Sequence, residues 1–173
     1  KALAGVGVVY KLMENLSHHY PALQPEQEFL DLVALGTVAD LVPLQGENRH
    51  LVKRGLEQLQ KPHRQGILSL MRVAGVSPET LQASDISFQL APRLNAAGRL
   101  TSAKYALELL LEEDVHRSGR LAQEIELFNN RRKELMQDMR SKAEEIAVPD
   151  DSVPPMLFAF HPDFNQGIVG LAA

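Results

Sequence analysis

The sequence has no cysteine and no tryptophan, and aromatic side chains make up only 5% of its 173 residues. The absence of cysteine excludes disulfides and thiolate metal sites, which leaves carboxylate and imidazole groups as metal ligands. Hard cations that prefer oxygen ligands are therefore the expected metals. No run of apolar residues reaches the roughly 18 that a membrane span needs, so we expect a cytoplasmic protein with no membrane partner.

What the sequence does contain is typical of a folded globular protein, with 45% hydrophobic and 23% charged residues. The net charge is −4 at neutral pH, yet residues 61–111 carry six basic against three acidic side chains. This basic block predicts a weak anion-facing surface. Because the chain begins without methionine and stops inside the apolar run "GIVGLAA", we expect it to be a piece of a longer protein.

Apolar periodicity predicts a mostly helical fold, with helices at 3–16, 26–35 (ended by Gly36), 47–59 and 121–147. The last should be one continuous helix of about 40 Å. Arg132 interrupts its apolar face, and we expect its charge to reach water along the aliphatic stem. After the linker signal "PDDSVPP", the segment "MLFAF" at 156–160 predicts a short buried strand near the C-terminus.

One acid, Asp40, stands in the otherwise uncharged run "ALGTVADLVPLQG". Two interpretations stay open. Thr37 and Asp40 have the spacing of a capping box, in which the carboxylate accepts a hydrogen bond from the Thr37 backbone. Alternatively, the carboxylate projects from the bend and binds a divalent cation, with the remaining ligands supplied from outside the chain.

Two further segments are candidates for phosphate contacts. In "APRLNAAGRL", Arg93 and Arg99 flank Asn95 and three small residues, and the planar fork of arginine suits phosphate oxygens. The alternatives are a helix N-terminus or a cluster of salt bridges between domains. In "HPDFNQGIVGLAA", Asn165 and Gly167 precede an apolar run, a pattern that can present backbone N–H groups to an anion.

The order of these segments resembles the bacterial RecJ single-stranded-DNA-specific exonucleases of the DHH phosphoesterase superfamily. "LAGVGVVYKL" looks like the helix that follows the family's DHH motif, and "DLVALGTVADLVPLQGENR" looks like its fourth acidic motif. "LAPRLNAAGRL" resembles its arginine motif, and "FNQGIVGLAA" resembles the start of its DHH-associated C-terminal domain. The resemblance covers essentially the whole chain.

The resemblance implies a fold and a set of roles. The chain would be a mostly α fragment of a two-domain α/β phosphoesterase, with 1–112 finishing the catalytic domain, 113–148 connecting the domains and 149–173 starting the second. The full-length protein would be a bacterial, monomeric 5′–3′ exonuclease of DNA repair and recombination that uses two Mn²⁺ or Mg²⁺ ions. Its partners would be single-stranded DNA and repair proteins such as single-strand-binding protein. Asp40 takes the catalytic metal-ligand position, and the phosphate-lining positions are Arg93, Asn95, Arg99, Asn165 and Gly167.

The chain departs from the family pattern in two ways. The upstream acidic motifs and the DHH triplet are absent, so the fragment alone should not be catalytic. Asn165 stands where the family usually has histidine, and an amide can hydrogen-bond a phosphate but cannot transfer a proton. Two alternative functions stay open: a small-substrate phosphodiesterase or pyrophosphatase of the same superfamily, and a non-catalytic helical module that docks a partner.

Overall fold

The structure, a computed structural model, describes residues 3–148 and 156–172, and within these ranges it consists of helices and loops without a strand. The first half contains α1 (Gly5–Ser17), α2 (Pro25–Glu28), α3 (Leu30–Ala39), α4 (Gly46–Leu59) and α5 (Gln65–Ala74). The second half contains η1 (Pro78–Thr80), α6 (Ala83–Asp85), η2 (Ile86–Leu90), α7 (Ala91–Leu100), α8 (Lys104–Leu111), α9 (Val115–Ala147) and α10 (Val169–Ala172). The predicted helical class is confirmed for these residues.

The helices predicted at 3–16 and 47–59 are confirmed as α1 and α4. The helix predicted at 26–35 is two helices, α2 and α3, and its predicted end at Gly36 is wrong because α3 continues to Ala39. Gly36 has a packing role instead. A Cβ atom at this position would lie 2.8 Å from Cγ1 of Val6, so the glycine lets α1 approach α3.

Two clusters of buried apolar side chains stabilise the helical body. The smaller cluster joins α1, α3 and α4 around Tyr10, Leu30, Val33 and Leu51. The larger cluster extends from α3 and α4 through α5, η2 and α8 to α9. At the α3–α4 crossing, a Cβ atom on Gly55 would lie 2.1 Å from the carbonyl oxygen of Leu30, so only glycine permits this approach.

The long helix α9 has 33 residues and therefore a length of about 50 Å. It starts six residues before the predicted start because Asp114 caps it, accepting a 2.7 Å hydrogen bond from the backbone N–H of Arg117. Its first turns are fixed to α5 by a 2.9 Å hydrogen bond between the hydroxyls of Ser69 and Ser118. Both groups are buried, so each satisfies the other.

The predicted strand at 156–160 is wrong. These residues have no regular secondary structure, and Met156, Leu157, Phe158 and Phe160 are between 55% and 80% exposed. A strand needs a neighbouring strand to satisfy its backbone groups, and the described part of the chain offers none. The apolar run therefore follows the strand pattern without forming a strand.

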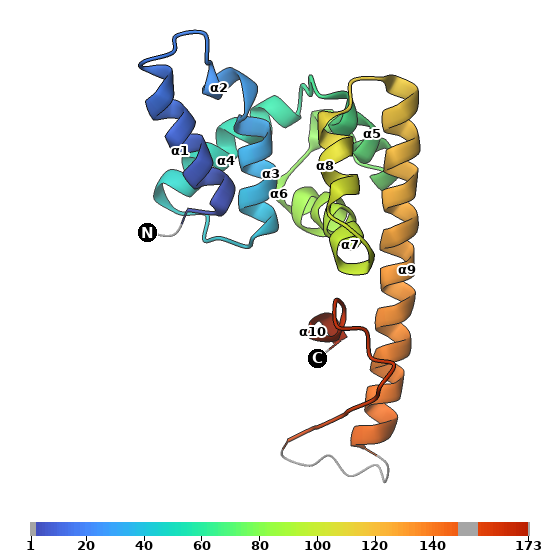
Figure 1. Ribbon diagram of the computed structural model, residues 1–173. Helices are drawn as coiled ribbons and strands as arrows, with labels where there is room; N and C mark the ends of the chain where they lie inside the picture. The colour runs from blue at the N-terminus through green and yellow to red at the C-terminus, as the bar shows by residue number, and fades with distance from the viewer. Residues whose placement is uncertain (1–2, 149–155, 173) are drawn as a thin grey trace.

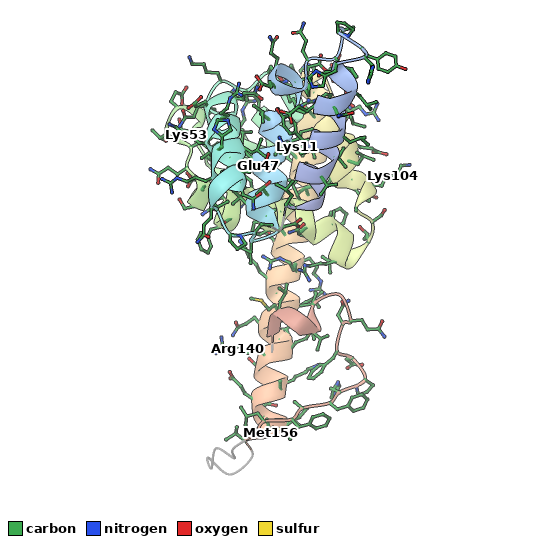
Figure 2. The ribbon with its side chains drawn as sticks, turned by 90° about the vertical axis from the view of Figure 1, so that its left-hand side faces the viewer. Lys11, Glu47, Lys53, Lys104, Arg140 and Met156 are labelled. Atoms are coloured by element: carbon green, nitrogen blue, oxygen red, sulfur yellow. The ribbon has the colours of Figure 1, made fainter. Side chains whose placement is uncertain are left out.

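Figure 1 shows α9 extending well beyond the helical body, with α10 and the segment that leads to it lying beside its lower half. Lys11 and Glu47 connect α1 to α4 on the other side of the body through an ion pair of 2.7 Å, and Figure 2 shows both residues on neighbouring helices. No helix in the described ranges has the length and apolar character of a membrane span. The predicted division at 112 and 148 stays a prediction, and residues 149–155 lie outside the described residues.

Candidate metal and phosphate site

Asp40 follows the last residue of α3, and its position excludes the capping-box interpretation. Thr37 lies inside the helix, so it cannot be the N-terminal cap that a capping box requires. The Asp40 side chain is exposed and makes no hydrogen bond or ion pair with any residue that the structure describes. A carboxylate at the C-terminal end of a helix faces the negative end of the helix dipole, which is unfavourable by about 0.3–1 kcal/mol.

The residue after Asp40 is also in an unfavourable conformation. Leu41 has a φ of 54°, the only positive φ outside glycine in the described ranges, and its side chain is 81% exposed. A left-handed conformation costs a residue with a Cβ atom roughly 1–2 kcal/mol. Because no packing of the Leu41 side chain offsets this cost, the bend that projects the Asp40 carboxylate is held at the expense of stability.

The Thr37 hydroxyl, close to Asp40 in the sequence, also lacks a hydrogen-bond partner. It is buried, and it neither donates nor accepts a hydrogen bond within the described chain. Residues three apart on a helix share a face, so Thr37 lies one turn before Asp40 on the same side of α3.

The described residues contain no group of three or more acidic or histidine side chains that could hold a metal ion. Asp40 can therefore supply one oxygen ligand, while a hard divalent ion takes about six.

Arg93 lies on α7 and is 8% exposed. Its guanidinium group forms a two-pronged ion pair with Glu126 of α9, with one N–O distance of 3.2 Å, and donates a 2.7 Å hydrogen bond to the carbonyl of Gln89. This geometry corresponds to the salt-bridge alternative that the sequence left open. The phosphate contact of Arg93 stays a prediction, and it would require the guanidinium to release Glu126.

Arg99 lies near the end of α7 and is exposed. Its Nη1 donates a 3.1 Å hydrogen bond to the carbonyl of Gly167, and a Cβ atom on Gly167 would lie 2.2 Å from the carbonyl oxygen of Arg99. Asn165 closes the same loop by accepting a 2.9 Å hydrogen bond from the backbone N–H of Gly167. The structure thus brings three of the predicted residues together, although Arg99 lies 68 positions before Gly167 in the sequence.

Asn95, between the two arginines, is exposed, and its side chain makes no hydrogen bond with the described residues. The predicted phosphate residues therefore fall into two groups. Arg93 is paired with Glu126, whereas Asn95 and Arg99 are exposed to solvent.

Sequence reasoning singled out Arg132 of α9 but missed its surroundings at the contact with α7. Arg132 donates a 3.0 Å hydrogen bond to Oδ1 of Asn129, and its Nε atom is buried without a partner in the described chain. The predicted extension of its charge into water is therefore wrong for this part of the head group. Burial, and secondarily the positive charge of Arg99, lower the pKa of Arg132. The break in the apolar face of α9 was the visible signal, but the partners of Arg132 were not readable from it.

We compared the sequence and the structure of the chain with those of known proteins. No family model matches the chain. Over its whole length it is 40% identical to a single-stranded-DNA-specific exonuclease of Escherichia coli K12, and 38% identical to one of Bacillus subtilis 168. The chain spans 33% of the first relative and 21% of the second. It is therefore homologous to part of a single-stranded-DNA-specific exonuclease.

These relatives are RecJ proteins, and the chain is a RecJ homologue along its whole length. Solved structures agree with this assignment. A crystal structure of RecJ from Thermus thermophilus in complex with Mn²⁺ matches 90% of the chain with a TM-score of 0.79 and 35% identity, and the chain covers 23% of that protein. The same protein in complex with Mg²⁺ matches with a TM-score of 0.76. The earlier resemblance is confirmed.

Proposed function

We propose that the chain is part of a metal-dependent 5′–3′ exonuclease that degrades single-stranded DNA in DNA repair and recombination. The observation that carries this proposal is the identity of about 40% over the whole chain to RecJ proteins. The extent of that match favours an exonuclease over a small-substrate phosphodiesterase and over a non-catalytic helical module. Hydrolysis is assigned to the full-length protein, because the described residues contain no group of three or more acidic or histidine side chains that could hold a metal ion.

Asp40 is the proposed metal ligand. Its carboxylate has no partner in the described ranges, faces the unfavourable end of α3 and precedes a strained residue. A cation bound to the carboxylate would offset its repulsion by the helix end, so the site is arranged for a positive ligand. When bound, Mn²⁺ or Mg²⁺ supplies an activated water and neutralises charge on the leaving oxygen.

The remaining predicted residues are proposed to guide the DNA backbone. Asn95 and Arg99 lie on one helix and offer solvent-facing donors for phosphate oxygens. Asn165 and Gly167 hold the loop that Arg99 contacts. For Arg93 we propose a positioning role in addition to the predicted phosphate contact, since its ion pair fixes α7 against α9.

The test is Asp40→Asn in the full-length protein, with Mn²⁺ and a 5′-labelled single strand. This change keeps the size of the side chain and removes the charge, so we expect turnover to be abolished. The free energy of unfolding should stay constant or rise by about 0.3–1 kcal/mol, because an unfavourable charge at the end of α3 is removed. Thermal unfolding measures this second effect.

Asp138→Asn is the matched control, because Asp138 is an exposed aspartate on another helix, α9. The control should retain full turnover. Activity that survives in Asp40→Asn would contradict the metal-ligand role. Activity and stability that fall together would show that Asp40 is structural.

A further inference from the structure

Positive charge gathers where the C-terminal end of α7 lies along α9. Arg99 on α7 and Arg132 on α9 interact electrostatically, and neither forms an ion pair with a carboxylate of the residues described here. The two like charges repel one another, and Arg132, which is partly buried, also loses hydration. A protein surface that keeps such a pair without an acidic partner is arranged for an anion from outside.

Two hydrogen-bond donors at Arg132 and the neighbouring Asn129 have no acceptor among the described residues. The Nε–H of Arg132 and the Nδ2 amide of Asn129 are buried and have no acceptor in the described ranges, and Asn129 is only 1% exposed. A buried donor without an acceptor destabilises the fold, so native proteins rarely keep two at one place without a ligand or water. Within the described chain, the side-chain oxygen bonded to Arg132 is Oδ1 of Asn129. The site therefore has donors in excess of acceptors.

The loop at 165–168 packs against Arg99. It is held to Arg99 through the carbonyl of Gly167 and has the fully buried Ile168 as its anchor. The tight fit of Gly167 against the Arg99 backbone leaves no space for a larger residue. Arg99, Arg132 and Asn129 thus come from two helices fixed by packing, and the positions of their donors are set before any ligand arrives.

We propose that Arg99, Arg132 and Asn129 form a binding site for a phosphate group. The planar fork of arginine suits the oxygens of a tetrahedral oxyanion, and an amide can donate one further hydrogen bond. The site is separate from Asp40 and rests on the proposed function only for its natural ligand, a backbone phosphodiester of single-stranded DNA. A free phosphate has the same chemistry, and the experiment distinguishes the two.

The test uses the full-length protein without divalent metal, so that no strand is cleaved. Arg132→Gln is compared with Arg131→Gln, because Arg131 is the adjacent arginine, is 60% exposed and pairs with Glu134 at 3.1 Å. For a single strand, we expect Arg132→Gln to weaken binding about tenfold and to reduce the slope of log K against log salt by about 0.7. Arg131→Gln should leave both unchanged.

The second arm replaces DNA by inorganic phosphate. Phosphate should raise the melting temperature of the wild type and of Arg131→Gln more than chloride does at equal ionic strength, and Arg132→Gln should lose this excess. Arg132→Lys, which keeps the charge and loses the fork, should retain part of it. This arm needs no nuclease activity, so it stays informative where the proposed function fails.

The two arms together identify the ligand. A loss in both assigns the site to the DNA backbone, and a loss in the phosphate arm alone assigns it to free phosphate. The proposal is overturned when Arg132→Gln and Arg131→Gln respond equally in both arms.

Discussion

The contact between α7 and α9 has two ends of opposite electrostatic character. At one end, Arg93 of α7 meets Glu126 of α9 in a buried ion pair. Six residues further along each helix, Arg99 and Arg132 are close enough for their charges to interact, so a cation of α9 stands at the position that an acid has in the first pair. The two pairs have the same separation of 33 positions in the sequence, which shows that the helices run side by side in one direction.

The difference shows how one motif can contain arginines with different tasks. Arg93 has all the acceptors that it needs within the chain, and it stabilises the α7–α9 contact. Arg99 has only a backbone carbonyl among the described residues, and the neighbouring charge of Arg132 repels it. Spare positive charge close to hydrogen-bond donors that lack an acceptor is typical of anion sites, whereas a completed ion pair is typical of a structural contact.

The largest effect is expected at the paired end. Glu126→Gln removes the charge that compensates Arg93, whose side chain is only 9% exposed. A buried charge that loses its partner destabilises the fold by roughly 3–5 kcal/mol. Since the Glu126 side chain is 24% exposed and water can partly replace it, we expect about 3 kcal/mol, measured by denaturant unfolding.

Glu124→Gln provides the control for that change, because Glu124 lies on the exposed face of the same helix. Its unfolding free energy should change by less than about 0.5 kcal/mol. Equal effects of the two substitutions would show that the Arg93–Glu126 pair does not stabilise the contact.

The next effect has the opposite sign and concerns the unpaired end. Arg132→Glu places an acid opposite Arg99, in the relation that Glu126 has to Arg93, and it removes the repulsion between two cations. Both changes favour folding, so we expect the free energy of unfolding to rise by about 1 kcal/mol, the upper range for a partly exposed pair. Thermal unfolding at low and high salt measures it, because the gain should shrink as salt screens the charges. A fall in stability would show that Arg132 is needed for packing.

The sequence predicted the elements that depend on one periodic face. The helices α1, α4 and most of α9 follow from their apolar spacing, although α1 buries Tyr10 and leaves Val9 and Leu12 of its apolar face exposed. It failed where structure depends on distant segments. Gly36 was interpreted as a helix end, although its neighbour Val6 gives it a packing role, and residues 156–160 were predicted as a strand that the described chain cannot pair.

The candidate site was predictable to a similar degree. The sequence singled out Asp40 as an unexplained acid and Arg132 as an unexplained cation in an apolar face. It could not pair Arg93 with Glu126 or Arg132 with Arg99, because both contacts depend on the register of α7 along α9. That register is set by packing of side chains from two helices, which spacing within one helix does not encode.

The smallest effect separates the two arginines of α7 in DNA binding. In the full-length protein, Arg99→Gln should reduce the slope of log K against log salt for a single strand by about 0.7, the value for one phosphate contact. It should change stability by about 0.5–1.5 kcal/mol at most, since only one hydrogen bond to the Gly167 carbonyl is lost. Arg93→Gln should lower the melting temperature, because the ion pair with Glu126 is lost. It should leave the salt slope unchanged, because in the wild-type protein the Arg93 guanidinium stays paired with Glu126 when DNA binds. A reduced slope in Arg93→Gln would instead support the phosphate contact predicted from the sequence, because it requires Arg93 to release Glu126 when DNA binds. An unchanged slope in both variants would show that neither arginine of α7 contacts a phosphate of the DNA.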